Sequence, residues 1–136
     1  MKIFRTFLFI LFLKTALFSE AQAIGAEEIE ASYKACLLNK TDTSGCARTY
    51  LRQMDSILNI VYDSVRQRLP ESEKITLTKD QLAWQNKRAE FNKKQDENWK
   101  YNLQEGTWGP AMIWVVYESK ANFIKKRVQA LSKKLK

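Results

Sequence analysis

One run of the sequence predicts a long amphipathic helix, and this helix restricts the possible folds more than any other feature. Between residues 45 and 69, apolar side chains recur at steps of three and four, which places them on one helix face. The members of this stripe are Cys46, Tyr50, Met54, Ile57, Leu58, Val61, Tyr62, Val65 and Leu69. Pro70 ends the helix, whose length is about 37 Å at about 1.5 Å per residue. Long helices in small domains usually pack against antiparallel neighbours, so the sequence predicts a helical bundle.

Three further segments have helical patterns. Residues 26–38 begin with several Glu, which suits a helix N-terminus, and Thr43 or Ser44 is expected to cap the second helix after a loop over 39–45. Residues 75–101 form the third helix, and Pro110 is the expected first residue of the fourth. The whole chain has only four Gly and two Pro, too few turn residues for a β-sandwich or barrel. The prediction is an all-α, small antiparallel four-helix, bundle-like domain over residues 24–136.

The N-terminal residues have the three parts of a secretory signal peptide. Lys2 and Arg5 precede an apolar run over residues 7–13, and Ala21-Gln22-Ala23 supplies a cleavage site of small residues. The apolar run is shorter than the roughly 20 residues that a membrane-spanning helix needs. The sequence therefore predicts a signal peptide over residues 1–23, cleavage after Ala23, and a periplasmic or secreted product without a transmembrane segment.

The composition disfavours most catalytic chemistry. The chain has no His, which removes the commonest general base and the commonest metal ligand, and its two Cys cannot complete a zinc site alone. No nucleophile–base pair or metal cluster can be assembled, so the expectation is a binding protein without cofactor rather than an enzyme. Because an exported protein meets an oxidising compartment, Cys36 and Cys46 are expected to form a disulfide.

Several motifs, taken in order, resemble those of one family. They are Leu58-Asn59-x-x-Tyr62, then Leu77-x-x-x-Gln81-x-x-Trp84-x-x-x-Arg88, then Gly106-Thr107 before a helix, and Arg127 in the last helix. Together with the two Cys, they resemble the LprI-type lysozyme-inhibitor domain from about residue 35 to residue 131. This resemblance implies an exported, helical, disulfide-bearing and non-catalytic module whose partner is a protein, lysozyme or another toxin.

The chain departs from the family pattern at a second pair of Cys. The matching positions here are Asn92 and about Ser119, so the resemblance implies that Cys36–Cys46 is the only disulfide. The third and fourth helices then depend on packing alone. Within the motifs, Gln81, Trp84 and Arg88 share one helix face and are expected to pack internally, while Asn59 is expected to be a buried hydrogen-bonding residue.

The loop before the fourth helix contains the candidate partner-binding residues. Trp108 lies in a polar segment between two Gly, off any apolar stripe, where an aromatic side chain is either a contact anchor or folds back onto the core. The other candidates are Trp99, Tyr101, Gly106 and Thr107.

The net charge supports an alternative function. It is +8 for the whole chain and falls to +6 when Lys2, Arg5, Lys14 and Glu20 leave with the signal peptide. Lys125, Lys126, Lys133 and Lys134 near the C-terminus are either a solvated helix face or a site for an anionic envelope surface, such as lipid, lipopolysaccharide or a cell-wall polymer. Export disfavours nucleic acid. A basic protein also meets long-range repulsion from the well-known lysozymes, which are basic, unless a local acidic patch such as Glu27, Glu28 and Glu30 makes the contact.

Overall fold

The described part of the chain is almost entirely helical. In the computed structural model, which describes residues 25–39 and 42–136, there are four α-helices and two short 3₁₀ helices, with no strand in those ranges. The elements are α1 (Gly25–Leu38), α2 (Thr43–Arg68), α3 (Glu71–Gln104), η1 (Pro110–Met112), α4 (Ile113–Ser132) and η2 (Lys133–Leu135). The all-α prediction is confirmed. The predicted signal peptide and its cleavage site lie outside the described residues.

Two helix starts differ from the sequence predictions. The cap of α2 is Asp42, not Thr43 or Ser44, because the Asp42 carboxylate accepts a hydrogen bond of 2.8 Å from the Gly45 N–H. A Cβ on residue 45 would lie 2.0 Å from that carboxylate, so any other residue there would displace the capping group. Helix α3 begins at Glu71, four residues earlier than predicted. Pro70 precedes it, and two Glu in its first turn favour the positive end of the helix dipole.

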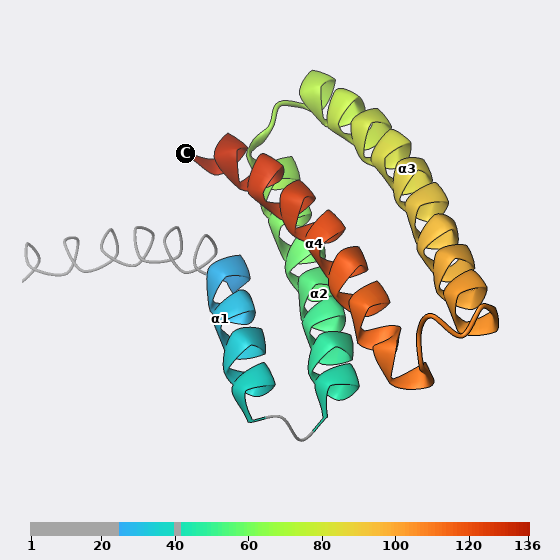
Figure 1. The fold of residues 1–136 in the computed structure, drawn as a ribbon. Coiled ribbons are helices and arrows are strands. Elements are labelled where there is room, and N and C mark those ends of the chain that lie inside the picture. The colour runs from blue at the N-terminus through green and yellow to red at the C-terminus, as the bar shows by residue number, and fades with distance from the viewer. Residues whose placement is uncertain (1–24, 40–41) are drawn as a thin grey trace, which may run out of the picture.

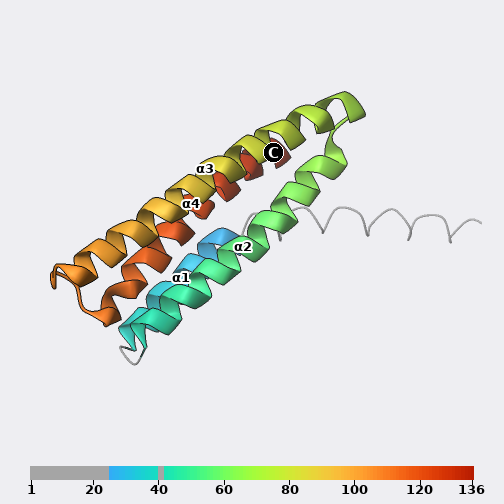
Figure 2. The same ribbon diagram turned by 90° about the vertical axis from the view of Figure 1, so that its right-hand side faces the viewer.

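Consecutive helices are antiparallel, but the most extensive packing joins α2 to α4, which run parallel (Figure 1). Helix α1 packs mainly on α2 and α3 mainly on α4, so the two flank the central pair on opposite sides (Figures 1 and 2). The core lies between the central helices. Its most deeply buried side chains are Ala47, Tyr50, Met54, Val61 and Val65 of α2, and Val116, Ala121, Ile124, Val128 and Leu131 of α4.

The flanking helices are attached in different ways. Cys36 of α1 and Cys46 of α2 form a disulfide with a Cα–Cα distance of 5.8 Å, as predicted, and no free cysteine remains in the described residues. Helix α3 has only two buried residues, Leu77 and Gln81. Its aromatic side chains meet α4 instead, where Phe91 stacks on Phe123 with ring centroids 4.5 Å apart. None of the described helices is long and apolar enough to cross a membrane.

Candidate functional site

The family-motif residue Arg127 joins α4 to α3. Its guanidinium donates two hydrogen bonds to Gln81 Oε1, from Nε at 3.0 Å and from Nη2 at 2.8 Å. Nη2 also lies 2.8 Å from the Asp80 carboxylate. Gln81 is only 8% exposed, so its carbonyl oxygen needs these donors to replace lost water. These motif residues therefore make contacts within the domain.

Trp84 lies between two arginine side chains. The guanidinium groups of Arg88 and Arg127 are each 5.8 Å from its ring centroid, a distance typical of cation–π contacts. Arg88 is also 2.7 Å from the Asp55 carboxylate of α2, and Trp84 stacks on Phe123 of α4. The Trp84 and Arg88 motif therefore links α3 to both central helices.

The motif on α2 is only partly buried. Leu58 belongs to the core, and the hydroxyl of half-buried Tyr62 lies 3.4 Å from that of Thr78 on α3. Asn59 is exposed, so the prediction that it is buried is wrong. It lies two residues before Val61 of the core stripe, which at about 100° per residue turns it to the opposite side of the helix.

The turn between α3 and α4 is held by a dense set of hydrogen bonds. Gly106 has a φ of 70°, and its N–H donates to Leu103 O, while the Thr107 N–H donates to Asn102 O at 3.0 Å. These two bonds form a Schellman motif, which requires a left-handed residue and therefore favours glycine. The sequence motif Gly106-Thr107 thus has a structural explanation in the end of α3.

Asn102, which belongs to none of the motifs named above, organises this turn. Its carbonyl oxygen also accepts hydrogen bonds from the Trp108 N–H at 3.1 Å and from the Thr107 hydroxyl at 3.0 Å. Its side chain accepts from the same hydroxyl at 2.8 Å and donates to Asn98 O at 2.8 Å. The signal that could have revealed it is an Asn four residues before the Gly-Thr pair.

The predicted partner-binding residues are displayed unequally. Tyr101 is 61% exposed, Gly106 and Thr107 are exposed, and Trp108 is half-buried. Trp99 faces inward, because its indole Nε1 is buried and has no hydrogen-bond partner among the described residues. Four of the five candidates therefore present surface at the end of α3 and in the turn after it, whereas the indole nitrogen of Trp99 is buried.

The basic residues near the C-terminus do not form one uniform surface. Lys125 is only 20% exposed, and its ammonium group pairs with Glu30 of α1, which also pairs with Lys34 at 3.2 Å. Hydrogen bonds from these two lysines lower the pKa of Glu30 below its usual value. Lys125 is therefore a link between α1 and α4 and not the free surface cation that the sequence analysis expected. Lys126, Lys133 and Lys134 are exposed.

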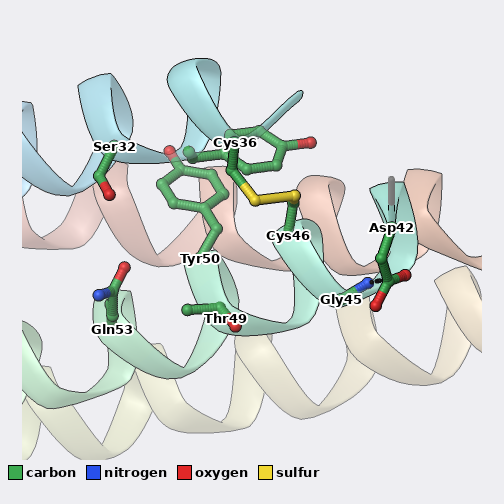
Figure 3. A pocket seen from close by; sticks show the side chains of 9 residues that line it. Ser32, Cys36, Asp42, Gly45, Cys46, Thr49, Tyr50 and Gln53 are labelled. Atoms are coloured by element: carbon green, nitrogen blue, oxygen red, sulfur yellow. Dashed lines mark hydrogen bonds between the residues drawn. A yellow bond between two sulfur atoms is a disulfide. The ribbon is translucent and has the colours of Figure 1, made fainter. Parts of the chain in front are cut away.

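A hollow of about 320 Å³ lies between α1 and α2 beside the disulfide (Figure 3). Its residues are Ser32, Tyr33, Cys36, Asp42, Gly45, Cys46, Thr49, Tyr50 and Gln53. The rings of Tyr33 and Tyr50 stack in parallel 4.5 Å apart, and the Tyr50 hydroxyl donates to Asn122 at 3.1 Å. Burial raises the pKa of Tyr50 to about 12 and raises that of Tyr33 as well. Both hydroxyls therefore stay protonated at neutral pH and provide no base.

The rest of the described chain offers no metal site. Residues 25–39 and 42–136 contain no group of three or more His, Cys, Asp or Glu that could hold an ion. The end of α3 and the turn after it combine an exposed aromatic side chain, that of Tyr101, with a hydrogen-bonded backbone.

Comparison with known families identifies the chain. The family of the lysozyme inhibitor LprI matches residues 35–131, from the second half of α1 to the last turn of α4. This range contains both cysteines and every motif residue named above, and it confirms the predicted resemblance. No curated protein and no solved structure matches the chain.

Proposed function

Because the chain belongs to the LprI family of lysozyme inhibitors, we propose that it is an exported, non-catalytic module that binds and inhibits a lysozyme or a similar toxin. The contact surface that we propose consists of Tyr101, Gly106, Thr107 and Trp108 at the α3–α4 turn. The observation that carries this proposal is the set of hydrogen bonds that connects the backbone from Tyr101 to Trp108.

A rigid turn favours binding because little conformational entropy is lost when a partner docks. Tyr and Trp are the residue types that most often dominate the binding energy of protein interfaces. Tyr101, in the last turn of α3, has most of its side chain in solvent, and Trp108, in the turn that follows, is half-buried.

The local charge of the turn also suits a basic partner. Residues 101–112 contain one charged side chain, that of Glu105, which is exposed. The adjacent Lys100 is also exposed and offsets Glu105, so this surface is close to neutral and most of the positive charge of the protein lies elsewhere. This arrangement reduces the repulsion expected from the net charge alone.

Inhibition assays against a panel of lysozymes test this proposal. We expect the wild type to inhibit at least one of them, and Trp108→Ala to weaken binding by about 2 kcal/mol or more, which is roughly 30-fold. Tyr101→Ala provides a second test, since its exposed side chain is not needed for folding. Leu38→Ala is the matched control, because Leu38 is 79% exposed on α1.

Salt dependence and turnover complete the test. A contact anchored by aromatic residues keeps its affinity at high salt, whereas an ionic contact weakens as the screening length falls below about 8 Å. Full inhibition by both turn variants would contradict the proposed surface. Hydrolysis of peptidoglycan by the protein itself would contradict a non-catalytic role.

A further inference from the structure

Helix α3 carries apolar side chains on two opposite faces. Leu77 and Trp84 face the central helices, whereas Ile75 and Leu82 are 61% and 58% exposed. Ile75 and Leu82 are seven residues apart and so lie on one face after two turns. Leu77 follows Ile75, and Trp84 follows Leu82, by two positions, which is about 200° around the helix. The outward pair is therefore not part of the core.

Two cations flank this exposed pair. Lys79 lies four residues after Ile75 and three before Leu82, which places it between them on the same face. Arg66 at the end of α2 lines a hollow of about 310 Å³ together with Ile75 and Lys79. Glu71 and Lys74 line the same hollow and pair with each other at 2.6 Å. This pairing, and to a smaller extent the charge of Arg66, lowers the pKa of Glu71, so the hollow contains three cations and one carboxylate. We name Arg66, Ile75, Lys79 and Leu82 the elbow patch, after the bend between α2 and α3.

Further positive charge gathers at the same end of the molecule. Arg68 donates a hydrogen bond of 2.9 Å to the Leu135 carbonyl oxygen, which brings η2 against the end of α2. The C-terminus therefore lies near the α2–α3 connection (Figure 1). Lys133, Lys134 and Lys136, all exposed, add three cations at this end.

We propose that the elbow patch docks the protein on an anionic phospholipid membrane, with Ile75 and Leu82 entering the boundary between headgroups and acyl chains. Exposed aliphatic side chains surrounded by Lys and Arg are typical of surfaces that bind in this interface. Each cation near an anionic leaflet adds about 1 kcal/mol of attraction. An anionic polymer has no apolar phase to receive Ile75 and Leu82, and two aliphatic side chains are too small a surface for a stable protein interface.

The elbow patch and the proposed inhibitory turn lie at opposite ends of α3. Leu82 of the elbow patch and Tyr101 of the turn surface are 19 residues apart in α3, or about 28 Å at about 1.5 Å per residue, so the two surfaces do not overlap. This inference does not depend on lysozyme binding, and the two can fail separately.

Vesicle binding tests the proposal. The protein is collected from the exported fraction of cells that express the full chain, and its N-terminus is determined by mass spectrometry. We compare sedimentation with vesicles of phosphatidylcholine alone and of phosphatidylcholine mixed with phosphatidylglycerol. We expect binding to the mixed vesicles, reduced about tenfold or more by Ile75→Ala with Leu82→Ala and similarly by Arg66→Gln with Lys79→Gln.

Matched variants distinguish docking from general attraction. Leu38→Ala removes an exposed aliphatic side chain elsewhere, and Lys94→Gln with Lys126→Gln removes two exposed charges elsewhere. Both controls should bind as the wild type does, and all variants should keep the wild-type circular dichroism. No binding to the anionic vesicles would overturn the proposal. The proposal would also be overturned if the Arg66/Lys79 and Lys94/Lys126 variants lost vesicle binding equally while the Ile75/Leu82 variant lost none. Lysozyme inhibition should be unchanged in the elbow variants, and vesicle binding unchanged in Trp108→Ala.

Discussion

The two flanking helices, α1 and α3, are attached to the central pair by different kinds of interaction. Helix α1 has 14 residues and is tied to α2 by a disulfide and to α4 by the Glu30–Lys125 pair. Helix α3 has 34 residues, no covalent link, and a series of separate contacts along its length. A short helix buries too little surface to stay docked without a crosslink, whereas a long helix can add many weak contacts.

The contacts of α3 are also chemically mixed. They combine the aromatic stacks on Phe123 with charged links, namely Arg127 to Asp80, Arg88 to Asp55 and Lys120 to Asp96. Because these contacts leave one face of α3 free, that face can carry exposed aliphatic side chains. The exposed face of α3 carries two aliphatic side chains seven residues apart, Ile75 and Leu82, whereas the only exposed large aliphatic side chain of α1 is Leu38 at its end.

The largest expected effect comes from a substitution in the central pair, α2 and α4, because both flanking helices pack on it. Met54 is completely buried in the central pair, so Met54→Ala should lower the free energy of unfolding by about 2–5 kcal/mol. Urea unfolding followed by circular dichroism measures this loss. Leu82→Ala is the matched control, with an expected change below about 0.5 kcal/mol because its side chain is exposed. A similar loss in both variants would contradict the assignment of the core.

Removal of the disulfide should affect the two flanking helices differently, because the crosslink holds α1 and not α3. The crosslink joins residues ten apart in sequence, and Cys36→Ser with Cys46→Ser should lower the free energy of unfolding by about 3 kcal/mol. Hydrogen exchange should rise in α1 and stay unchanged in the C-terminal half of α3. Uniform deprotection of all four helices would show instead that α1 does not open on its own.

Arg127→Ala is the corresponding change for α3. The Arg127 side chain is only 10% exposed and makes hydrogen bonds to Gln81 and Asp80, so its loss should cost about 2 kcal/mol. Hydrogen exchange should rise in the first half of α3 and not in α1. Lys126→Ala removes the neighbouring exposed cation and should leave stability nearly unchanged. Arg127→Lys should restore little of the lost stability, because a lysine cannot donate to Gln81 and Asp80 with the geometry of the guanidinium group.

The smallest effect concerns the ion pair that helps to hold α1. The folded state lowers the pKa of Glu30, so this pair stabilises the protein above the carboxyl's ordinary pKa of 4.5 and is lost as the pH falls through the lowered value. Glu30→Gln should cost about 0.5–1 kcal/mol at neutral pH, because the pair is partly solvated. Its unfolding should also depend less on pH below 4.5 than that of the wild type. Glu28→Gln, at an exposed position of the same helix, is the control.

Local patterns predicted much of the fold because helix periodicity and chain breakers act over neighbouring residues. The stripe from Cys46 to Val65 is buried in α2 except for half-buried Tyr62, and Pro70 separates α2 from α3 as expected. The cap at Asp42 was missed because several cap-forming residues follow one another, and only the backbone geometry selects among them. Asn59 belongs to a motif, and this led to the wrong prediction that it is buried. Its position two residues before Val61 places it on the solvent side of α2.

The sequence by itself determined the helical class, the disulfide and the family, because these follow from spacing and residue type. The tertiary structure decided which charged and polar groups are free. Lys125 meets Glu30 across 95 residues of sequence, and Arg127 meets Gln81 across 46. It also decided that parallel α2 and α4 form the central pair and that one face of α3 stays uncovered. Such contacts depend on how whole helices pack, and no local pattern in a single segment records them.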